Sequence, residues 1–296
     1  MIRKRVTLEF LAYAVILLVS LGLRFINLGQ PPLNDFEASN ALAALDLVKG
    51  SQSHLPGQAG YLAFTTGTFF IFNATDFFAR FWPALIGSLL VLIPAFFRQQ
   101  IGRIPALLLA AFFAIDPLLI ATSRTAAGGI FGVAGMLAGI GFWQHRRPVL
   151  SGIAFALMLA GGVDMWSGLL ALLLSIVILR LIPRVFNVGE FAARKPDLRK
   201  LVVSAAVTLL LVSTVFLIKP QVIGSLGAGF TDYLLSWTTI SLPFSYHSIL
   251  AWLMTLLPGV VLGVWGIIAG LREKDTYSRF LAMWWTLLLL IAVLNP

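Results

Sequence analysis

The chain contains no cysteine and carries little charge of either sign. Without cysteine it can hold neither a disulfide framework nor a thiolate metal site. Charged residues make up 11% of the sequence, against about 25% in ordinary soluble domains. Hydrophobic residues make up 59%, and the mean hydropathy is +0.94. This composition excludes a soluble domain and indicates an integral membrane protein.

Several motifs of soluble enzymes are also missing. The sequence has no glycine-rich loop that would cradle a phosphate, no dinucleotide fingerprint and no Ser-His-Asp arrangement. Their absence argues against a nucleotide-driven pump and against a serine hydrolase.

The apolar stretches have the length of helices, whereas an outer-membrane barrel would show alternating strands of roughly 10 residues. The sequence therefore predicts an all-α, polytopic transmembrane bundle of about nine spans, forming a single domain over residues 1–296. The expected spans are 8–28, 81–97, 104–120, 129–143, 149–163, 166–182, 201–217, 248–270 and 280–293.

The N-terminus sets the orientation. Arg3, Lys4 and Arg5 precede the run 8–28, which is too long for a signal-peptide core and lacks a small-residue cleavage site. We interpret this run as a retained signal anchor, and the basic residues before it place the N-terminus in the cytoplasm. We therefore expect a multi-pass protein of the cell membrane, in contact with membrane lipids.

The distribution of basic residues decides whether the apolar segment 58–72 crosses the membrane. If it does not cross, 16 of the 21 basic residues lie inside, leaving outside Arg24, Lys49, Arg80, Arg124 and Lys219. If it did cross, only 6 would lie inside. The positive-inside rule favours the first arrangement, with this segment as a helix in the outer interface or re-entering partway. The net charge of +9 is then explained by topology, and nucleic acid is not an implied partner.

The first outer loop, residues 27–80, holds a pair of acids in a chain with only 12 Asp and Glu residues. Within it, 35–49 carries apolar residues at the spacing of an amphipathic surface helix: Ala38, Ala41, Leu42, Leu45 and Val48. Two interpretations of the acids remain open. Asn34 and Glu37 fit a capping box, and Asp35 suits the helix dipole. Alternatively, the acids belong to an active site.

Four signals follow one another in this topology. They are Asp35-Phe36-Glu37, His54-Leu55-Pro56-Gly57, an Arg80-Phe81-Trp82-Pro83 span start, and Asp116-Pro117 through Ser123-Arg124. In this order the chain resembles the GT-C membrane glycosyltransferases, in particular the protein O-mannosyltransferase and lipid A aminoarabinose transferase branch, over about residues 5–246. It departs from that pattern where Phe36 splits the acids, where the His54 turn keeps one proline, and where Thr125 replaces a frequent arginine.

The resemblance implies an enzyme that moves a sugar from a polyprenyl-phosphate donor to a protein or lipid acceptor on the extracytoplasmic face, with inversion. The expected catalytic residues are Asp35 as base and Glu37 as its positioning partner, with the reverse assignment open. Arg124 is the expected donor-phosphate ligand, because its planar fork matches two phosphate oxygens. Further candidates are Lys219 and Arg24 for the phosphate, and His54, Asp116 and Arg80.

Structural interpretations stand beside these roles. In these interpretations Arg24 anchors the end of its span by extending its charged group to the membrane surface, and Arg80 caps its helix. Asp116 caps a turn together with Pro117, and His54 is a loop residue whose polar group is hydrogen-bonded. Asp35, Glu37 and Asp116 offer oxygen ligands of the kind a divalent metal takes, but no metal-ligand spacing requires a cofactor. Glycines at 128, 132, 135 and 139 predict close helix packing.

A function of another class remains as the alternative: a non-catalytic polytopic protein, either a carrier of lipid-linked sugars or a degenerate subunit whose partner completes a larger assembly. Two features keep it open: the altered acid pair, and the chain's end at Asn295-Pro296 directly after a span, which fits a fragment of a longer chain. The sequence specifies neither sugar, acceptor nor oligomeric state.

Overall fold

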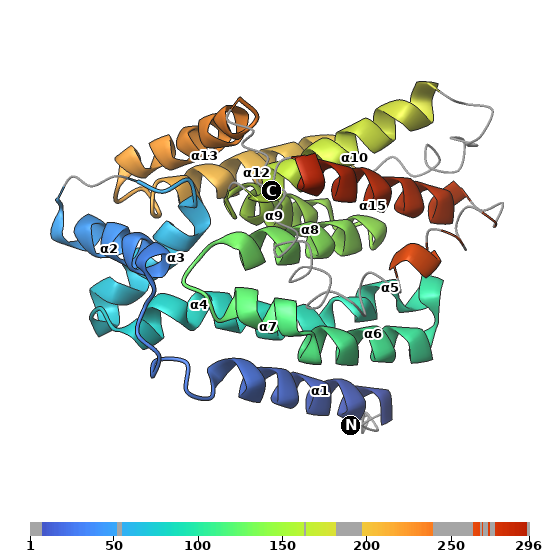
Figure 1. Ribbon diagram of the computed structural model, residues 1–296, viewed down its shortest axis with the longest axis horizontal. Coiled ribbons are helices and arrows are strands. Elements are labelled where there is room, and N and C mark those ends of the chain that lie inside the picture. Colours follow the sequence, from blue (N-terminus) through green and yellow to red (C-terminus); the bar gives the residue numbers. More distant parts are fainter. Residues whose placement is uncertain are drawn as a thin grey trace. The chain divides into compact units, whose positions relative to one another are not determined.

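The computed structural model describes residues 8–51, 55–162, 164–181, 197–238, 263–266, 268, 272 and 276–294, where the regular secondary structure is helical (Figure 1). The helices are α1 (Leu8–Phe25), α2 (Asp35–Lys49), α3 (Ala59–Phe72), α4 (Asp76–Leu89), η1 (Leu90–Leu92), α5 (Pro94–Ile101), α6 (Arg103–Ile115), α7 (Pro117–Ser123), α8 (Gly129–Gln144), α9 (Pro148–Leu159), α10 (Asp164–Leu181), α12 (Leu198–Ser213), η2 (Pro220–Val222), α13 (Ile223–Ser236) and α15 (Thr276–Leu294). The all-α prediction is confirmed for these ranges.

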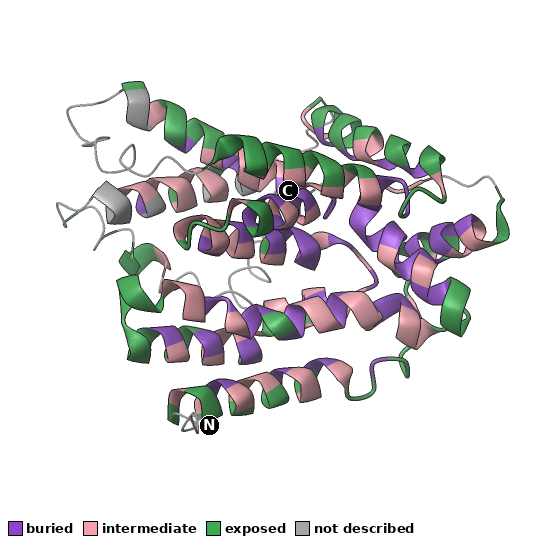
Figure 2. Cartoon of the chain, turned by 180° about the vertical axis from the view of Figure 1, so that it is seen from behind, coloured by how far each residue is buried: buried purple, intermediate pink, exposed green. Residues whose placement is uncertain are grey.

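Two helical stretches among the described residues are long and apolar enough to cross a membrane: α1 and the continuous run α4–η1–α5, Asp76–Ile101. The bent pair α6 and α7 makes a third if it is one broken span. Only 17% of α1 is buried, and little of it has the buried colour in Figure 2. Leu8, Val15 and Leu18 are exposed along it, as expected for a lipid-facing helix. The prediction of about nine spans is not confirmed, and most of the expected span 248–270 lies outside the described residues.

The expected span 104–120 is broken at Asp116, where α6 and α7 meet at an angle of 55°. Pro117 has no backbone N–H and cannot continue the helical ladder back to Phe113. Asp116 instead caps α7, since its carboxylate accepts a hydrogen bond of 2.8 Å from the Leu119 amide. The expected span 201–217 also ends early, because α12 stops at Ser213 and a turn with positive φ at residues 215–217 follows.

Helix α2 has the bounds that the sequence predicts, and it begins with the expected Asn34–Glu37 capping box. The buried face differs from the expected one. It follows Glu37, Asn40, Ala41, Ala44 and Leu47, whereas Leu42 is 57% exposed. Relative to the expected orientation, α2 is rotated about its own axis, because it packs against α3. Small alanine side chains lie in this contact.

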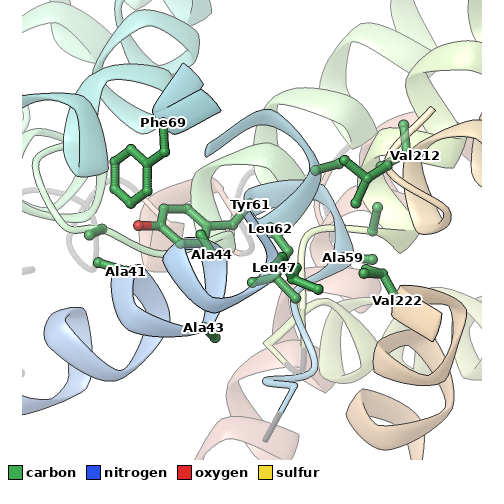
Figure 3. Close-up of a cluster of buried hydrophobic side chains, with 14 of the residues drawn as sticks. Ala41, Ala43, Ala44, Leu47, Ala59, Tyr61, Leu62, Phe69, Val212 and Val222 are labelled. Carbon is green, nitrogen blue, oxygen red and sulfur yellow. The ribbon is translucent and has the colours of Figure 1, made fainter. Parts of the chain in front are cut away.

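A cluster of buried apolar residues lies where α2, α3, α12 and η2 meet. Leu47 of α2, Leu62 of α3, and Val212 and Val222 from the later segment are buried together (Figure 3). Helix α3 is buried along its first three turns, and its tip is exposed. At 14 residues it is shorter than a span, but so are α8 and α9, and the expectation that segment 58–72 does not cross stays a prediction.

The chain divides into two compact units, residues 1–162 with 196–229 and residues 163–195 with 230–296. In the second unit the Trp284 indole donates to the Gly168 carbonyl of α10 at 3.4 Å. The same unit has an apolar cavity of about 520 Å³, lined by residues of α10, of the C-terminal part of α13 and by Trp237 directly after it; Trp166, Leu173 and Phe230 are among the others. The candidate residues discussed below belong to the first unit.

The predicted glycine packing is confirmed between α8 and α9. A methyl group at Gly135 would lie 2.6 Å from the Ala154 carbonyl oxygen. We therefore expect Gly135→Ala to lower the free energy of unfolding by about 1–3 kcal/mol through overpacking. Gly67→Ala on α3 is the matched control, because nothing lies within 4 Å of the added methyl group; it should raise stability by about 0.5–1 kcal/mol. Thermal unfolding in detergent measures both, and equal shifts would contradict the packing.

Candidate functional site

One end of the first unit brings the first-loop acids together with the segment that follows α7, about 90 residues later in the chain. Glu37 is the meeting point. Its carboxylate accepts from the Ala126 amide at 2.9 Å, from the Asn34 amide at 3.2 Å and from the Arg80 guanidinium. Loop 27–34, α4 and the segment between α7 and α8 are thus tied to the first turn of α2.

Glu37 and Arg80 form a buried, two-pronged ion pair. Arg80 Nε donates to Glu37 Oε1 and Nη2 to Oε2, each at 2.7 Å, and the two side chains are only 5% and 6% exposed. Arg80 also donates to the carbonyls of Leu28, Pro31 and Pro32. The prediction that Arg80 only caps its helix is too limited, because its side chain holds the whole exit from α1.

The contacts of Glu37 set its charge state. Burial by itself would raise the pKa of this carboxyl, but the hydrogen bonds from Arg80, Ala126 and Asn34 outweigh it and hold the pKa below the ordinary value of 4.5. Glu37 is therefore ionised and fully engaged at neutral pH, an arrangement that suits positioning rather than proton transfer.

This pKa shift predicts an acid sensitivity. A carboxyl whose pKa is lower in the folded state stabilises the fold above its ordinary pKa, and this stability is lost as the pH falls through the lowered folded-state value. We expect the melting temperature of the native protein to fall below about pH 4.5 more steeply than that of Glu37→Gln. Thermal scans from pH 7 to pH 3 measure the difference, and parallel curves would contradict it.

Arg24 and Arg124 clamp each other's helices. Arg24, fully buried on α1, donates to the Phe113 carbonyl at 2.9 Å, to the Ala114 carbonyl at 3.1 Å and to the Ser123 hydroxyl at 2.9 Å. It thereby satisfies carbonyls at the break before Pro117. Arg124, directly after α7, donates in return to the Leu23 and Ile26 carbonyls at 2.9 Å, at the end of α1. Arg24 is thus a buried clamp and not a snorkelling anchor.

The two arginines bond to uncharged groups. Their acceptors are neutral carbonyl and hydroxyl oxygens, and the ion pairs among the described residues join Arg80 to Glu37, Arg98 to Glu9 and Lys200 to Asp197. Arg124 is half-buried and donates through Nη1 and Nη2, so its Nε–H is not used in these bonds. The Asp116 carboxylate acts electrostatically on the buried Arg24, whereas the half-buried Arg124 forms none of the ion pairs of the described residues.

Asp35 differs from Glu37 in being exposed. It is the first residue of α2, and a residue two positions from Glu37 does not share its face of the helix. The carboxylate makes none of the hydrogen bonds that hold Glu37. Of the two acids, Asp35 is the one that an incoming molecule can reach.

The remaining candidates are distributed differently. Asp116, the cap of α7, lies near the Arg24 clamp. Lys219 lies apart, with its ammonium 3.8 Å from where a β-carbon on Gly50 would be, at the far end of α2 and about 20 Å along the helix from Asp35. His54 falls outside the described residues. In the described part of the chain, no three His, Asp or Glu side chains gather as metal ligands do.

The structure adds polar groups that the sequence pattern does not single out. The Asn40 amide donates to the Ala126 carbonyl at 2.9 Å, next to the Glu37 bond to the Ala126 amide. Tyr61 and Thr65 are fully buried, and their hydroxyls have no hydrogen-bond partner among the described contacts. Figure 3 shows the Tyr61 hydroxyl directed toward Ala41, one turn from Glu37. Their only sequence signal is polarity within an apolar segment.

Comparison with protein-family models, with curated proteins and with solved structures found no match.

Proposed function

We propose that this protein is a membrane glycosyltransferase, which takes a sugar from a polyprenyl-phosphate donor and transfers it to a protein or lipid acceptor on the extracytoplasmic side of the cell membrane. One observation carries the proposal: an exposed carboxylate, Asp35, lies at the same end of the unit as Arg24 and Arg124, neither of which forms an ion pair in the described part of the chain. Acid and cations are the two groups that transfer from a phosphate ester needs.

Each group has a role in a single inverting displacement. Asp35 removes the proton of the acceptor hydroxyl, whose oxygen bonds to the anomeric carbon as the bond from that carbon to the phosphate oxygen breaks. The departing polyprenyl phosphate carries the negative charge, which Arg124 stabilises through its remaining N–H groups. Glu37, held by Arg80 and the Ala126 amide, fixes the turn that presents Asp35.

The second candidate is the non-catalytic protein, either a carrier or a subunit of a larger assembly. The complete engagement of Glu37 in structural bonds favours it, because one member of the acid pair then has no free lone pair for chemistry. It differs from the enzyme in a simple way: it binds the lipid-linked sugar and returns it unchanged.

Binding of polyprenyl phosphate, the common leaving group, tests the phosphate site without knowledge of the sugar. We expect Arg124→Gln to weaken binding, measured by native mass spectrometry in detergent, at least about tenfold, since a hydrogen bond to a charged group contributes about 1.5–3 kcal/mol. Arg124→Lys, which keeps the charge, should lose less. Arg98→Gln removes a charge from an exposed pair and is the control. Equal losses in Arg124→Gln and Arg98→Gln would refute the phosphate site.

A further inference from the structure

The tip of α3 exposes three large apolar side chains in succession. Phe70, Ile71 and Phe72 are 79%, 69% and 57% exposed, whereas Tyr61, Leu62 and most other residues of the first three turns are buried. Exposed apolar residues in one contiguous group mark a contact surface. We call these three residues the α3 tip.

The position of the α3 tip along the chain gives its level relative to the membrane. Only Asn73, Ala74 and Thr75 separate it from Asp76, where the candidate span Asp76–Ile101 begins. A span begins at a membrane surface, and the four residue steps from Phe72 to Asp76 reach at most about 14 Å. The α3 tip therefore lies within that distance of the surface at which α4 enters.

Aromatic contacts fix the same level independently. The Phe72 ring stacks on Phe78 at 5.3 Å, and Phe77 and Phe81 of the same turns lie 6.4 and 5.8 Å from Phe25. Phe25 is the last residue of α1, the other long candidate span. A strip of aromatic rings thus joins the α3 tip to the end of one span and the start of another, where aromatic side chains gather in membrane proteins.

We propose that the α3 tip is a membrane anchor: Phe70, Ile71 and Phe72 insert into the lipid at the level where α1 ends and α4 begins. The buried part of α3 packs on α2, so the anchor holds the first turn of α2, with Asp35 and Glu37, at a fixed height above the bilayer. The partner of this surface is the lipid itself. The proposal does not depend on glycosyl transfer, since it rests on exposure and on the two candidate spans.

The absence of cysteine makes the test direct, because a single introduced cysteine is the only labelling site. We would place a nitroxide spin label on Ile71→Cys, or on Phe70→Cys, in the full chain reconstituted in phosphatidylcholine and phosphatidylglycerol vesicles. Collision rates with oxygen, which partitions into lipid, and with a water-soluble nickel chelate then report depth. Leu18→Cys on the exposed face of α1 and Lys49→Cys at the end of α2 are the lipid and water controls.

The proposal predicts that the label at residue 71 meets oxygen several-fold more often relative to the nickel chelate than the label at residue 49 does, and approaches the ratio at residue 18. A ratio equal to that of residue 49 would overturn it, because the tip would then face water. Exclusion of both reagents would overturn it as well, because the tip would then be covered by protein.

Discussion

Replacing Arg80 by leucine should lower the free energy of unfolding by about 3–5 kcal/mol, because it leaves the buried Glu37 carboxylate without its cation. The loss also strips donors from the carbonyls of Leu28, Pro31 and Pro32, which have no helical partners in the exit from α1. We expect loop 27–34 to lose its fixed path and α2 to lose its docking on α4. Denaturation in mixed micelles measures the change.

Arg98→Leu is the matched control for this prediction. It also pairs with a glutamate, Glu9, but through a single contact of 3.2 Å and with the arginine 51% exposed, so its loss should cost about 0–1 kcal/mol. The double variant Arg80→Leu with Glu37→Leu should recover part of the stability, because the unpaired charge is then gone. If Arg80→Leu and Arg98→Leu were equally mild, the ion pair would not organise this end of the protein.

Replacing Asp35 by asparagine should reduce sugar transfer by about 10²–10⁴-fold, the range that a general base contributes. The side chain is exposed and outside the Glu37 network, so the melting temperature should stay unchanged. Transfer of labelled sugar from a polyprenyl-phosphate donor to membrane acceptors measures the activity, with acceptor saturated so that the chemical step is observed.

Asp46→Asn is the control for the activity. Asp46 lies on the same helix, near its opposite end, where the Ser51 hydroxyl donates to it at 3.3 Å. It should retain full transfer. Glu37→Gln should lose activity together with stability, as expected for a positioning residue. Unchanged transfer in both Asp35→Asn and Glu37→Gln would remove the catalytic role of this pair.

Local rules predict local structure well in this chain. The capping box at Asn34 and Glu37, the bounds of α2 and the glycine contacts of α8 depend on residues close in sequence or on size alone, and the structure has them as expected. The bend at Asp116–Pro117 could also have been anticipated from proline, but a long apolar run conceals it. The buried face of α2 could not, because α3 rather than the membrane selects it.

The roles of the arginines illustrate what sequence leaves open. The predicted topology places Arg24 and Arg124 near the outer membrane surface, and in the structure the two residues lie next to each other. Which carbonyls they bond depends on the 55° break and on the end of α1, neither of which the apolar pattern specifies. Lys219 shows the opposite case. The predicted topology places Lys219 and Arg124 on the same side of the membrane, but in the structure Lys219 lies at the far end of α2.

A structure of the full chain with polyprenyl phosphate bound in a lipid nanodisc would test the central claim most directly. The account predicts phosphate density within hydrogen-bond distance of the Arg124 guanidinium, with the lipid tail leaving toward the membrane and the Asp35 carboxylate facing the phosphate across a space the size of one sugar. A phosphate bound only among basic residues at the opposite ends of the helices, or an Asp35 turned away from it, would contradict the proposed transferase.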